Sequence, residues 1–134
     1  MASAAKIRVL IAEDNVAYRY ALLRILKEYP NLEVVGEATN GEDAISQAEE
    51  LRPTIVLMDI NMPKLDGIVA TRHIKTHYKE ITVIGLSVRA DPYYVNAMRN
   101  AGAAELLAKE NATEDLYDAI QRAVASRKPP FHNA

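Results

Sequence analysis

Cysteine is absent from the 134 residues of this chain, and long apolar runs are absent too. Without cysteine the chain can form neither disulfides nor thiolate metal sites, which fits a reducing compartment. No apolar stretch approaches the ~20 residues that a membrane-spanning helix needs. The N-terminus, MASAAKIRV, also lacks the apolar segment of a signal peptide. These absences favour a soluble, cytoplasmic domain.

The chain also lacks a large excess of positive or negative charge. Sixteen Lys and Arg residues stand against 18 Asp and Glu residues, which gives a formal net charge of −2. Such a balance offers no electrostatic footprint for nucleic acid or for an anionic membrane surface. With 49% apolar and 25% charged residues, the composition is that of an ordinary globular protein. The length indicates one domain with one substantial core.

The chain does contain a regular alternation of two kinds of segment. Short runs rich in aliphatic and β-branched residues predict five strands. These runs are IRVLIA (7–12), LEVVGEA (32–38), TIVLMD (54–59), ITVIGLS (81–87) and AELLAK (104–109). The first, third and fourth runs are almost wholly apolar, which is typical of strands covered on both faces.

Segments with helical spacing lie between these runs. Apolar side chains at steps of three and four form one stripe in the first and the last of these segments. The two stripes are Tyr18, Leu22, Ile25, Leu26 and Tyr29, and Leu116, Ala119, Ile120, Ala123 and Val124. Asp91 and Pro92 are typical of a helix start, and Gly102 of a helix end. Five strand–helix units predict a parallel sheet with right-handed crossovers and helices on both faces.

Polar residues collect at the predicted exits of four strands. Glu13 and Asp14 follow the first strand, and Asp59 ends the third. Ser87 ends the fourth strand and Lys109 ends the fifth. Ligands of open parallel sheets bind beyond the carboxyl ends of the strands. We therefore expect three carboxylates, one hydroxyl and one ammonium group at one edge of the sheet.

Three carboxylates in one cleft repel one another unless one keeps a proton or a cation lies among them. Mg²⁺ prefers oxygen ligands and keeps several waters when it binds to a protein. The predicted metal ligands are the side chains of Glu13, Asp14 and Asp59 and the backbone carbonyl of Asn61. The loop after Asp59 must bend back toward the metal. Pro63 is expected to stiffen this loop, and Gly67 to give it backbone freedom.

A metal with free water positions binds phosphate, and this predicts a role for the other groups. The Asp59 carboxylate can act as a nucleophile and form an acyl phosphate. Lys109 would offset the charge of one phosphoryl oxygen, and Ser87 would donate to another. Taken singly, these residues are more often a loop acid, a surface charge and a turn hydroxyl. Their joint placement at neighbouring strand exits outweighs those plainer interpretations.

Four sequence blocks carry a resemblance to a known family. AEDN (12–15), MDINMPKLDG (58–67), GLS (85–87) and GAAELLAK (102–109) are similar to the receiver domain of bacterial two-component response regulators. The likeness spans roughly residues 6–127. It is strongest to receivers of NarL/LuxR-type regulators, which carry a helix-turn-helix output domain that these 134 residues do not include. Residues 1–127 are thus expected to form the receiver, and 128–134 a tail or the start of a linker.

The resemblance implies a flavodoxin-like (βα)5 fold with strand order 2-1-3-4-5. It implies that Asp59 is the phosphoacceptor, that Glu13 and Asp14 hold Mg²⁺, and that Ser87 and Lys109 are the switch hydroxyl and the family's lysine. A sensor histidine kinase or a phosphotransfer protein would donate the phosphoryl group. The domain would catalyse only its own phosphorylation and dephosphorylation, and would regulate transcription through an output domain.

The resemblance also implies partner surfaces. A homodimer would form through the fourth helix, fifth strand and fifth helix, or through the first and fifth helices. Leu106 stands where the family usually has Tyr or Phe, so the usual ring-based switch contact is unavailable although leucine can still change rotamer. Tyr94 is assigned about equally to the core and to an exposed partner surface.

Two further positions depart from the family pattern. Val88 follows the serine where alanine is common, and its β-branched side chain is expected to narrow access to Asp59. Glu110 follows the lysine where many receivers have proline.

Other functions fit parts of the pattern. A Mg²⁺-dependent aspartyl-phosphate phosphohydrolase would need a second acid two residues after its nucleophile, where this chain has Asn61. A stand-alone receiver would act through protein–protein interaction alone; a pseudo-receiver would be marked by loss of an acid or the lysine, and none is lost.

His73 and His77 have a spacing that can hold zinc, but they lack a third ligand of the HExxH type, so surface histidines are favoured.

Overall fold

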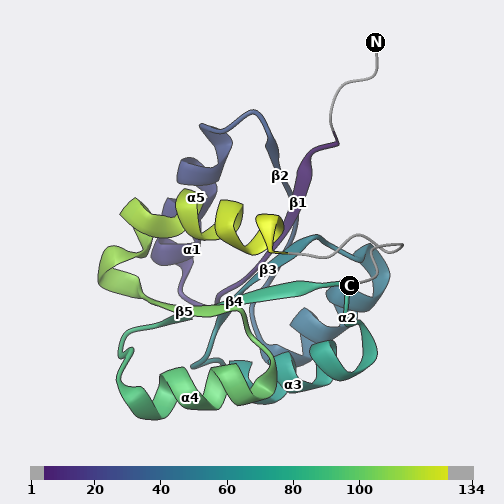
Figure 1. Cartoon of the computed structure of the whole chain (residues 1–134), viewed down its shortest axis with the longest axis vertical. Coiled ribbons are helices and arrows are strands. Elements are labelled where there is room, and N and C mark those ends of the chain that lie inside the picture. The colour runs from purple at the N-terminus through teal and green to yellow at the C-terminus, as the bar shows by residue number, and fades with distance from the viewer. Residues whose placement is uncertain (1–4, 127–134) are drawn as a thin grey trace.

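All five predicted strands are present, and they pair side by side in one parallel sheet (Figure 1). The computed structural model describes residues 5–126. The strands are β1 (Ile7–Ala12), β2 (Leu32–Ala38), β3 (Ile55–Asp59), β4 (Thr82–Ser87) and β5 (Glu105–Ala108). The helices are α1 (Val16–Lys27), α2 (Gly41–Leu51), α3 (Gly67–His77), α4 (Pro92–Ala101) and α5 (Lys109–Ala125). The order β2-β1-β3-β4-β5 confirms the predicted flavodoxin-like fold.

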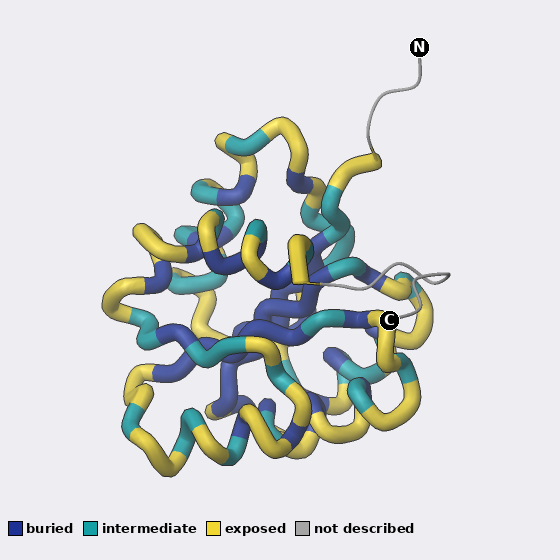
Figure 2. Tube along the Cα trace, viewed as in Figure 1, coloured by how far each residue is buried: buried dark blue, intermediate teal, exposed yellow. Residues whose placement is uncertain are grey.

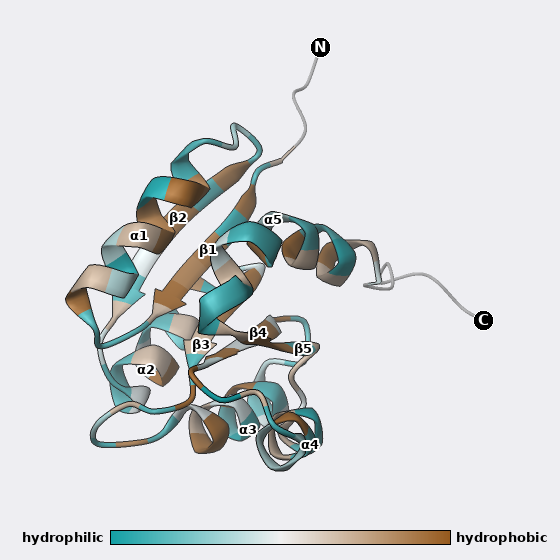
Figure 3. Cartoon of the chain, turned by 90° about the vertical axis from the view of Figure 1, so that its left-hand side faces the viewer, coloured by the Kyte–Doolittle hydropathy of each residue, from teal (hydrophilic) through white to brown (hydrophobic). Residues whose placement is uncertain are grey.

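The sheet lies between two helical layers, with α1 and α5 on one face and α2, α3 and α4 on the other (Figure 1). Successive side chains of a strand point to opposite faces. In β1, Val9 and Ile11 therefore pack toward α1 and α5, while Leu10 and Ala12 pack toward the other layer. Figure 2 shows the resulting buried band through the centre, and Figure 3 shows its apolar character. The nearly unbroken apolar runs follow from this two-sided burial.

Helix α4 begins and ends at the cap residues that the sequence predicts. The Asp91 side chain accepts from the Tyr94 N–H at the start of α4, and Gly102 ends α4 in the left-handed region at φ 108°. For α1 the cap is Asn15, whose Oδ1 accepts from the Tyr18 N–H at 2.8 Å. The cap is thus Asn15 and not the adjacent Asp14, which stays available to the sheet edge.

The last strand is shorter than predicted. β5 ends at Ala108, and Lys109 is the first residue of α5 instead of the last residue of a strand. The predicted tail at 128–134 lies outside the described residues. Within residues 5–126, the helices lack the combination of length and apolarity that crossing a bilayer requires.

Candidate functional site

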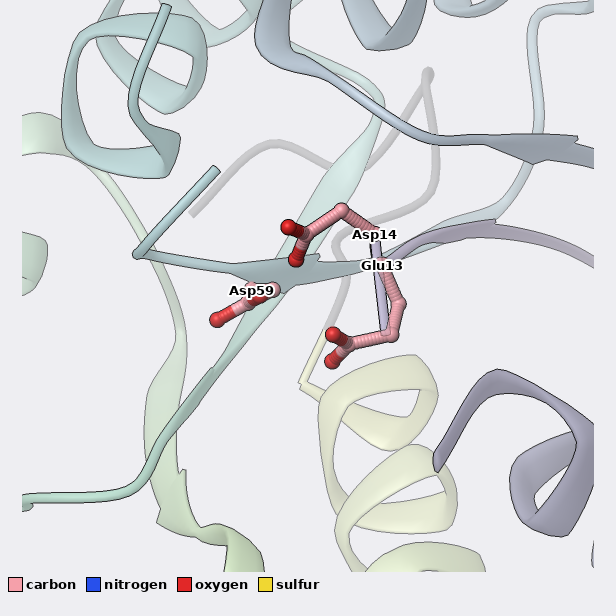
Figure 4. A group of neighbouring side chains, drawn as sticks. All are labelled: Glu13, Asp14 and Asp59. Atoms are coloured by element: carbon pink, nitrogen blue, oxygen red, sulfur yellow. The ribbon is translucent and has the colours of Figure 1, made fainter. Parts of the chain in front are cut away.

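Three carboxylates meet at the carboxyl edge of the sheet (Figure 4). Glu13 and Asp14 lie just beyond β1, and Asp59 is the last residue of β3. One carboxylate oxygen from each lies within 4.8 Å of the others. Glu13 is fully buried and Asp59 is 2% exposed, whereas Asp14 faces solvent. We call these three residues together with Lys109 the acidic site.

The position of Asp59 follows from its strand. Every residue of β3 is buried, because β1 and β4 pair with it on either side. The loop after the strand holds the carboxylate in place, since the Asn61 N–H donates to Asp59 Oδ1 at 3.1 Å. Whether the Asn61 carbonyl also reaches a metal stays a prediction.

Gly67 shapes this loop in a way the sequence did not predict. Its N–H donates to the Ile60 carbonyl at 2.9 Å, and an added Cβ would lie 2.2 Å from the Asp59 carbonyl oxygen. The expectation that Gly67 supplies unusual backbone freedom was wrong, because its φ is not positive. Glycine is needed there for the close approach of two backbones.

Lys109 brings the positive charge of the acidic site. Its Nζ lies 2.8 Å from Glu13 Oε1 and 3.5 Å from Asp59 Oδ2. Ser87 ends the strand next to β3 and is buried, and its hydroxyl donates to the Arg89 carbonyl. The same oxygen accepts from the Arg89 N–H at 3.1 Å. The serine is therefore engaged with the β4–α4 connection.

Burial is the largest cause that raises the pKa of Asp59, to about 7, and the charge of Glu13 comes next. The Asn61 N–H and Lys109 oppose the rise without cancelling it. One ammonium group thus does not neutralise the acids that surround it. Crowded oxygen ligands of this kind suit a hard divalent cation, which would relieve their repulsion.

Tyr18 belongs to the site although its sequence pattern suggested only a core position on α1. Its hydroxyl donates to the Lys109 carbonyl at 3.1 Å, and Lys109 Nζ lies 4.8 Å from the ring centroid. Burial, followed by the charges of Glu13 and Asp59, raises the pKa of Tyr18 to about 12. The available signal was a hydroxyl-bearing ring three residues after the α1 cap, at the sheet edge where the strand exits gather.

The residues predicted to carry output lie around the site and along α4 and β5. Leu106 is half-buried over Gly85, its partner in β4, where an added Cβ would lie 2.7 Å from Leu106 Cδ1. Tyr94 is half-buried and packs against the core on its side of the sheet, while neighbouring Tyr93 is 73% exposed. Val88 is 70% exposed. These residues thus divide into a half-buried pair and an exposed position at the rim.

His73 and His77 stack on each other on α3, with ring centroids 4.2 Å apart. Within residues 5–126, no third metal-binding side chain groups with them. His77 Nδ1 lies 2.9 Å from the His73 carbonyl, which is a contact within the helix. The favoured interpretation as surface residues agrees with this arrangement.

Known proteins of one family match this chain in sequence. Residues 9–121 match the family model of the response regulator receiver domain. The chain is 37% identical to the transcriptional regulatory protein DegU of Brevibacillus brevis, over 87% of this chain and 49% of that protein. It is 41% identical to protein-glutamate methylesterase/protein-glutamine glutaminase 4 of Myxococcus xanthus, over 87% of this chain and 33% of that protein.

A solved structure agrees as well. The signal receiver domain of the response regulator NarL from Mycobacterium tuberculosis superimposes with a TM-score of 0.87 at 26% identity, covering 92% of this chain and all of that one. The fold and the matches define a signalling domain of two-component systems. The chain belongs to the response regulator receiver domain family, and its relatives include transcriptional regulators. It spans about half the length of the DegU protein that it matches.

Proposed function

We propose that this receiver accepts a phosphoryl group on Asp59 and that Mg²⁺ supports the transfer. The side chains of Glu13, Asp14 and Asp59 and the backbone carbonyl of Asn61 would hold the cation. The observation that carries the proposal is the convergence of three carboxylates within 4.8 Å, with Lys109 Nζ 3.5 Å from Asp59 Oδ2. We place the receiver at residues 1–127 and a tail or linker start at 128–134.

The donor would be a phosphohistidine of a sensor kinase or of a phosphotransfer protein. An Asp59 carboxylate oxygen forms a bond to phosphorus as the phosphorus–nitrogen bond breaks. The imidazole leaves with the electron pair and takes up a proton. Bound Mg²⁺ would supply charge neutralisation for the phosphoryl oxygens. Lys109 offers one further positive charge within reach of the same carboxylate.

Ser87 would link phosphorylation of Asp59 to a structural change at the protein surface. Its hydroxyl now donates to the Arg89 carbonyl. A phosphoryl oxygen on Asp59 competes for that donor, and the β4–α4 connection must then rearrange. The equilibrium between two arrangements of α4 and β5, where Tyr94 and Leu106 lie, would shift in population.

The output would be regulation of transcription in a longer protein, as the name of the DegU relative suggests. Homodimers through α4, β5 and α5, or through α1 and α5, would be its assembly modes. A receiver that acts through protein contacts alone is the second candidate. A cycling phosphohydrolase is disfavoured, because Asn61 occupies the position of the second acid.

The test uses the whole chain, Mg²⁺ and acetyl phosphate. We expect one acid-stable, alkali-labile phosphoryl adduct by intact mass, and no adduct with Asp59→Asn. Asp115→Asn is the matched control, because Asp115 is exposed on α5 and outside the acidic site. An adduct that persists in the Asp59→Asn protein would contradict the assignment. Continuous release of phosphate from many monoesters would favour the phosphohydrolase instead.

A further inference from the structure

Two contacts join Tyr18 to Lys109, which is 91 residues further along the chain. The tyrosine hydroxyl donates to the Lys109 carbonyl at 3.1 Å. The lysine ammonium lies 4.8 Å from the centroid of the same ring, within the ~6 Å over which a cation is attracted to an aromatic face. One side chain therefore contacts both the backbone and the charged end of the lysine.

The start of α5 gives these contacts particular weight. The N-cap residue of α5 is Ala108, which makes no side-chain hydrogen bond to the first turn. Lys109 is the first residue of that turn. A lysine has a flexible stem and three rotatable donors, so the place of its ammonium group depends both on where its backbone is held and on contacts to the side chain. The Tyr18 hydroxyl supplies an anchor that the α5 sequence itself does not.

Tyr18 and Lys109 also line the same surface hollow. The lysine side chain is 16% exposed and borders an open hollow between α1 and the β4–α4 connection. The residues that line this hollow are Asn15, Ala17, Tyr18, Ala21, Val88 and Lys109. Among these described residues Tyr18 is the one aromatic side chain, and its ring is the one that contacts the ammonium.

Hydrogen bonds also connect the first turn of α1, where Tyr18 lies, to Glu13 of the acidic site. Asn15 Oδ1 accepts from the Tyr18 N–H at 2.8 Å, and the Asn15 N–H donates to Glu13 Oε2 at 3.0 Å. Arg19 donates to the Glu13 carbonyl at 2.9 Å. The first turn of α1 is thus tied to the same glutamate that pairs with Lys109.

We propose that Tyr18 is a positioning residue that holds the Lys109 ammonium between Glu13 and Asp59 for phosphoryl transfer. This inference rests on the proposed function of Asp59. The ring restrains the ammonium and the hydroxyl anchors the lysine backbone. Loss of both contacts should slow transfer because the charge is then less often in place.

The first experiment compares phosphorylation rates with Mg²⁺ and acetyl phosphate. Tyr18→Leu removes both contacts, and we expect a rate about tenfold lower. Tyr18→Phe keeps the ring and should give a rate between those of Tyr18→Leu and the unchanged protein. Tyr20→Leu is the matched control, since Tyr20 lies on the same helix and is 62% exposed. All rates are taken at a temperature at which circular dichroism shows every variant folded.

The second experiment asks whether Tyr18 acts through Lys109. In a Lys109→Ala background, followed over hours by intact mass, Tyr18→Leu should change the residual rate less than about twofold. Proton NMR of the Mg²⁺-free protein gives a readout that does not depend on phosphorylation. The Lys109 ε-methylene protons should be shifted upfield by the ring, and the shift should vanish in Tyr18→Leu.

Three results would overturn the inference: equal rates for Tyr18→Leu and Tyr20→Leu, an undiminished effect of Tyr18→Leu in the Lys109→Ala background, or identical ε-methylene shifts with and without the ring. Each of these leaves the Asp59 assignment intact if the unchanged protein still forms its adduct. Absence of any adduct in the unchanged protein would instead refute the proposed function, while the NMR comparison would still decide the contact.

Discussion

Charged residues gather at both ends of the strands, but they are exposed at the edge where the strands begin and largely buried at the edge where the strands end. Where β3 and β4 begin, Arg52 lies over the Tyr78 ring at 4.3 Å and within 3.5 Å of Glu80. The Tyr78 hydroxyl donates to Glu49 at 2.6 Å. We call these four residues the amino-edge cluster. Arg52 and Glu80 are each more than half exposed, so water can replace any contact that is lost.

At the opposite edge, the acidic site buries two of its three carboxylates. Glu13 and Asp59 are withdrawn from solvent and share one ammonium group, that of Lys109. The amino-edge cluster is satisfied and contributes little, as exposed pairs do. The acidic site is costly when left alone, and buried, crowded acids of this kind are typical of functional sites. The difference predicts that equivalent substitutions have unequal effects at the two edges.

The largest effect is expected from Lys109→Met. Removing the ammonium leaves Glu13 buried without its ion-pair partner, and we expect a loss of about 2–4 kcal/mol in the free energy of unfolding. Urea denaturation without Mg²⁺ measures it. Lys79→Met, on the exposed surface, is the control and should change stability little. A loss below about 0.5 kcal/mol for Lys109→Met would erase the contrast between the edges.

Asp59→Asn should have the opposite sign. The pKa of Asp59 is raised from 3.8 to about 7, so between these pH values the folded chain binds more protons than the unfolded chain. Stability therefore falls as pH rises through this window, and the full penalty is present above pH 7.

A neutral amide escapes that penalty but also gives up the attraction of Lys109. We expect Asp59→Asn to be more stable by about 1–3 kcal/mol at pH 8 without Mg²⁺. The advantage should disappear below about pH 3, where the aspartate is protonated in both the folded and the unfolded chain. Urea denaturation across this range measures it, and a destabilised variant at pH 8 would be the contrary result.

A smaller effect is expected at the rim of the acidic site. Val88 is 70% exposed and lines the hollow beside Lys109. Val88→Ala should speed phosphorylation by acetyl phosphate about twofold to fivefold, since a smaller side chain opens the approach to Asp59. Val69→Ala, at an exposed position on α3, is the control. Equal rates for Val88→Ala and the unchanged protein would contradict the steric explanation.

The smallest effect is expected at the amino-edge cluster. Glu80→Gln removes one charge from a pair that is 3.5 Å apart and more than half exposed. We expect a change of about 0.5 kcal/mol or less in the free energy of unfolding. A loss as large as that of Lys109→Met would show that burial is not what separates the two edges.

Much of this arrangement could be predicted from sequence because it depends on local pattern and on one topological rule. Apolar runs such as 54–59 identified the buried strands, and alternating strand–helix units defined the parallel sheet. In such a sheet every strand exit lies at one edge, so the sequence alone was enough to place Asp59, Glu13 and Lys109 together.

What the sequence did not predict depends on how the folded backbone brings particular residues together. Gly67 is explained by the Asp59 backbone beside it, which no local pattern encodes. Tyr18 fits a helical stripe so well that the sequence suggested a core position for it and not its contact with Lys109, which is 91 residues away. The cap at Asn15 rather than Asp14 reflects a competition between two adjacent polar residues, and only the backbone geometry decides it.

The proposed magnesium site has one physical premise, which is that the carboxylates are crowded beyond what Lys109 can neutralise. A ¹³C NMR titration of the Asp59 carboxyl carbon in the metal-free protein examines this premise without any intervening step. We expect a midpoint at a pKa of about 7, which falls when Mg²⁺ is added. A midpoint near the ordinary value of 3.8, unchanged by Mg²⁺, would refute the crowding.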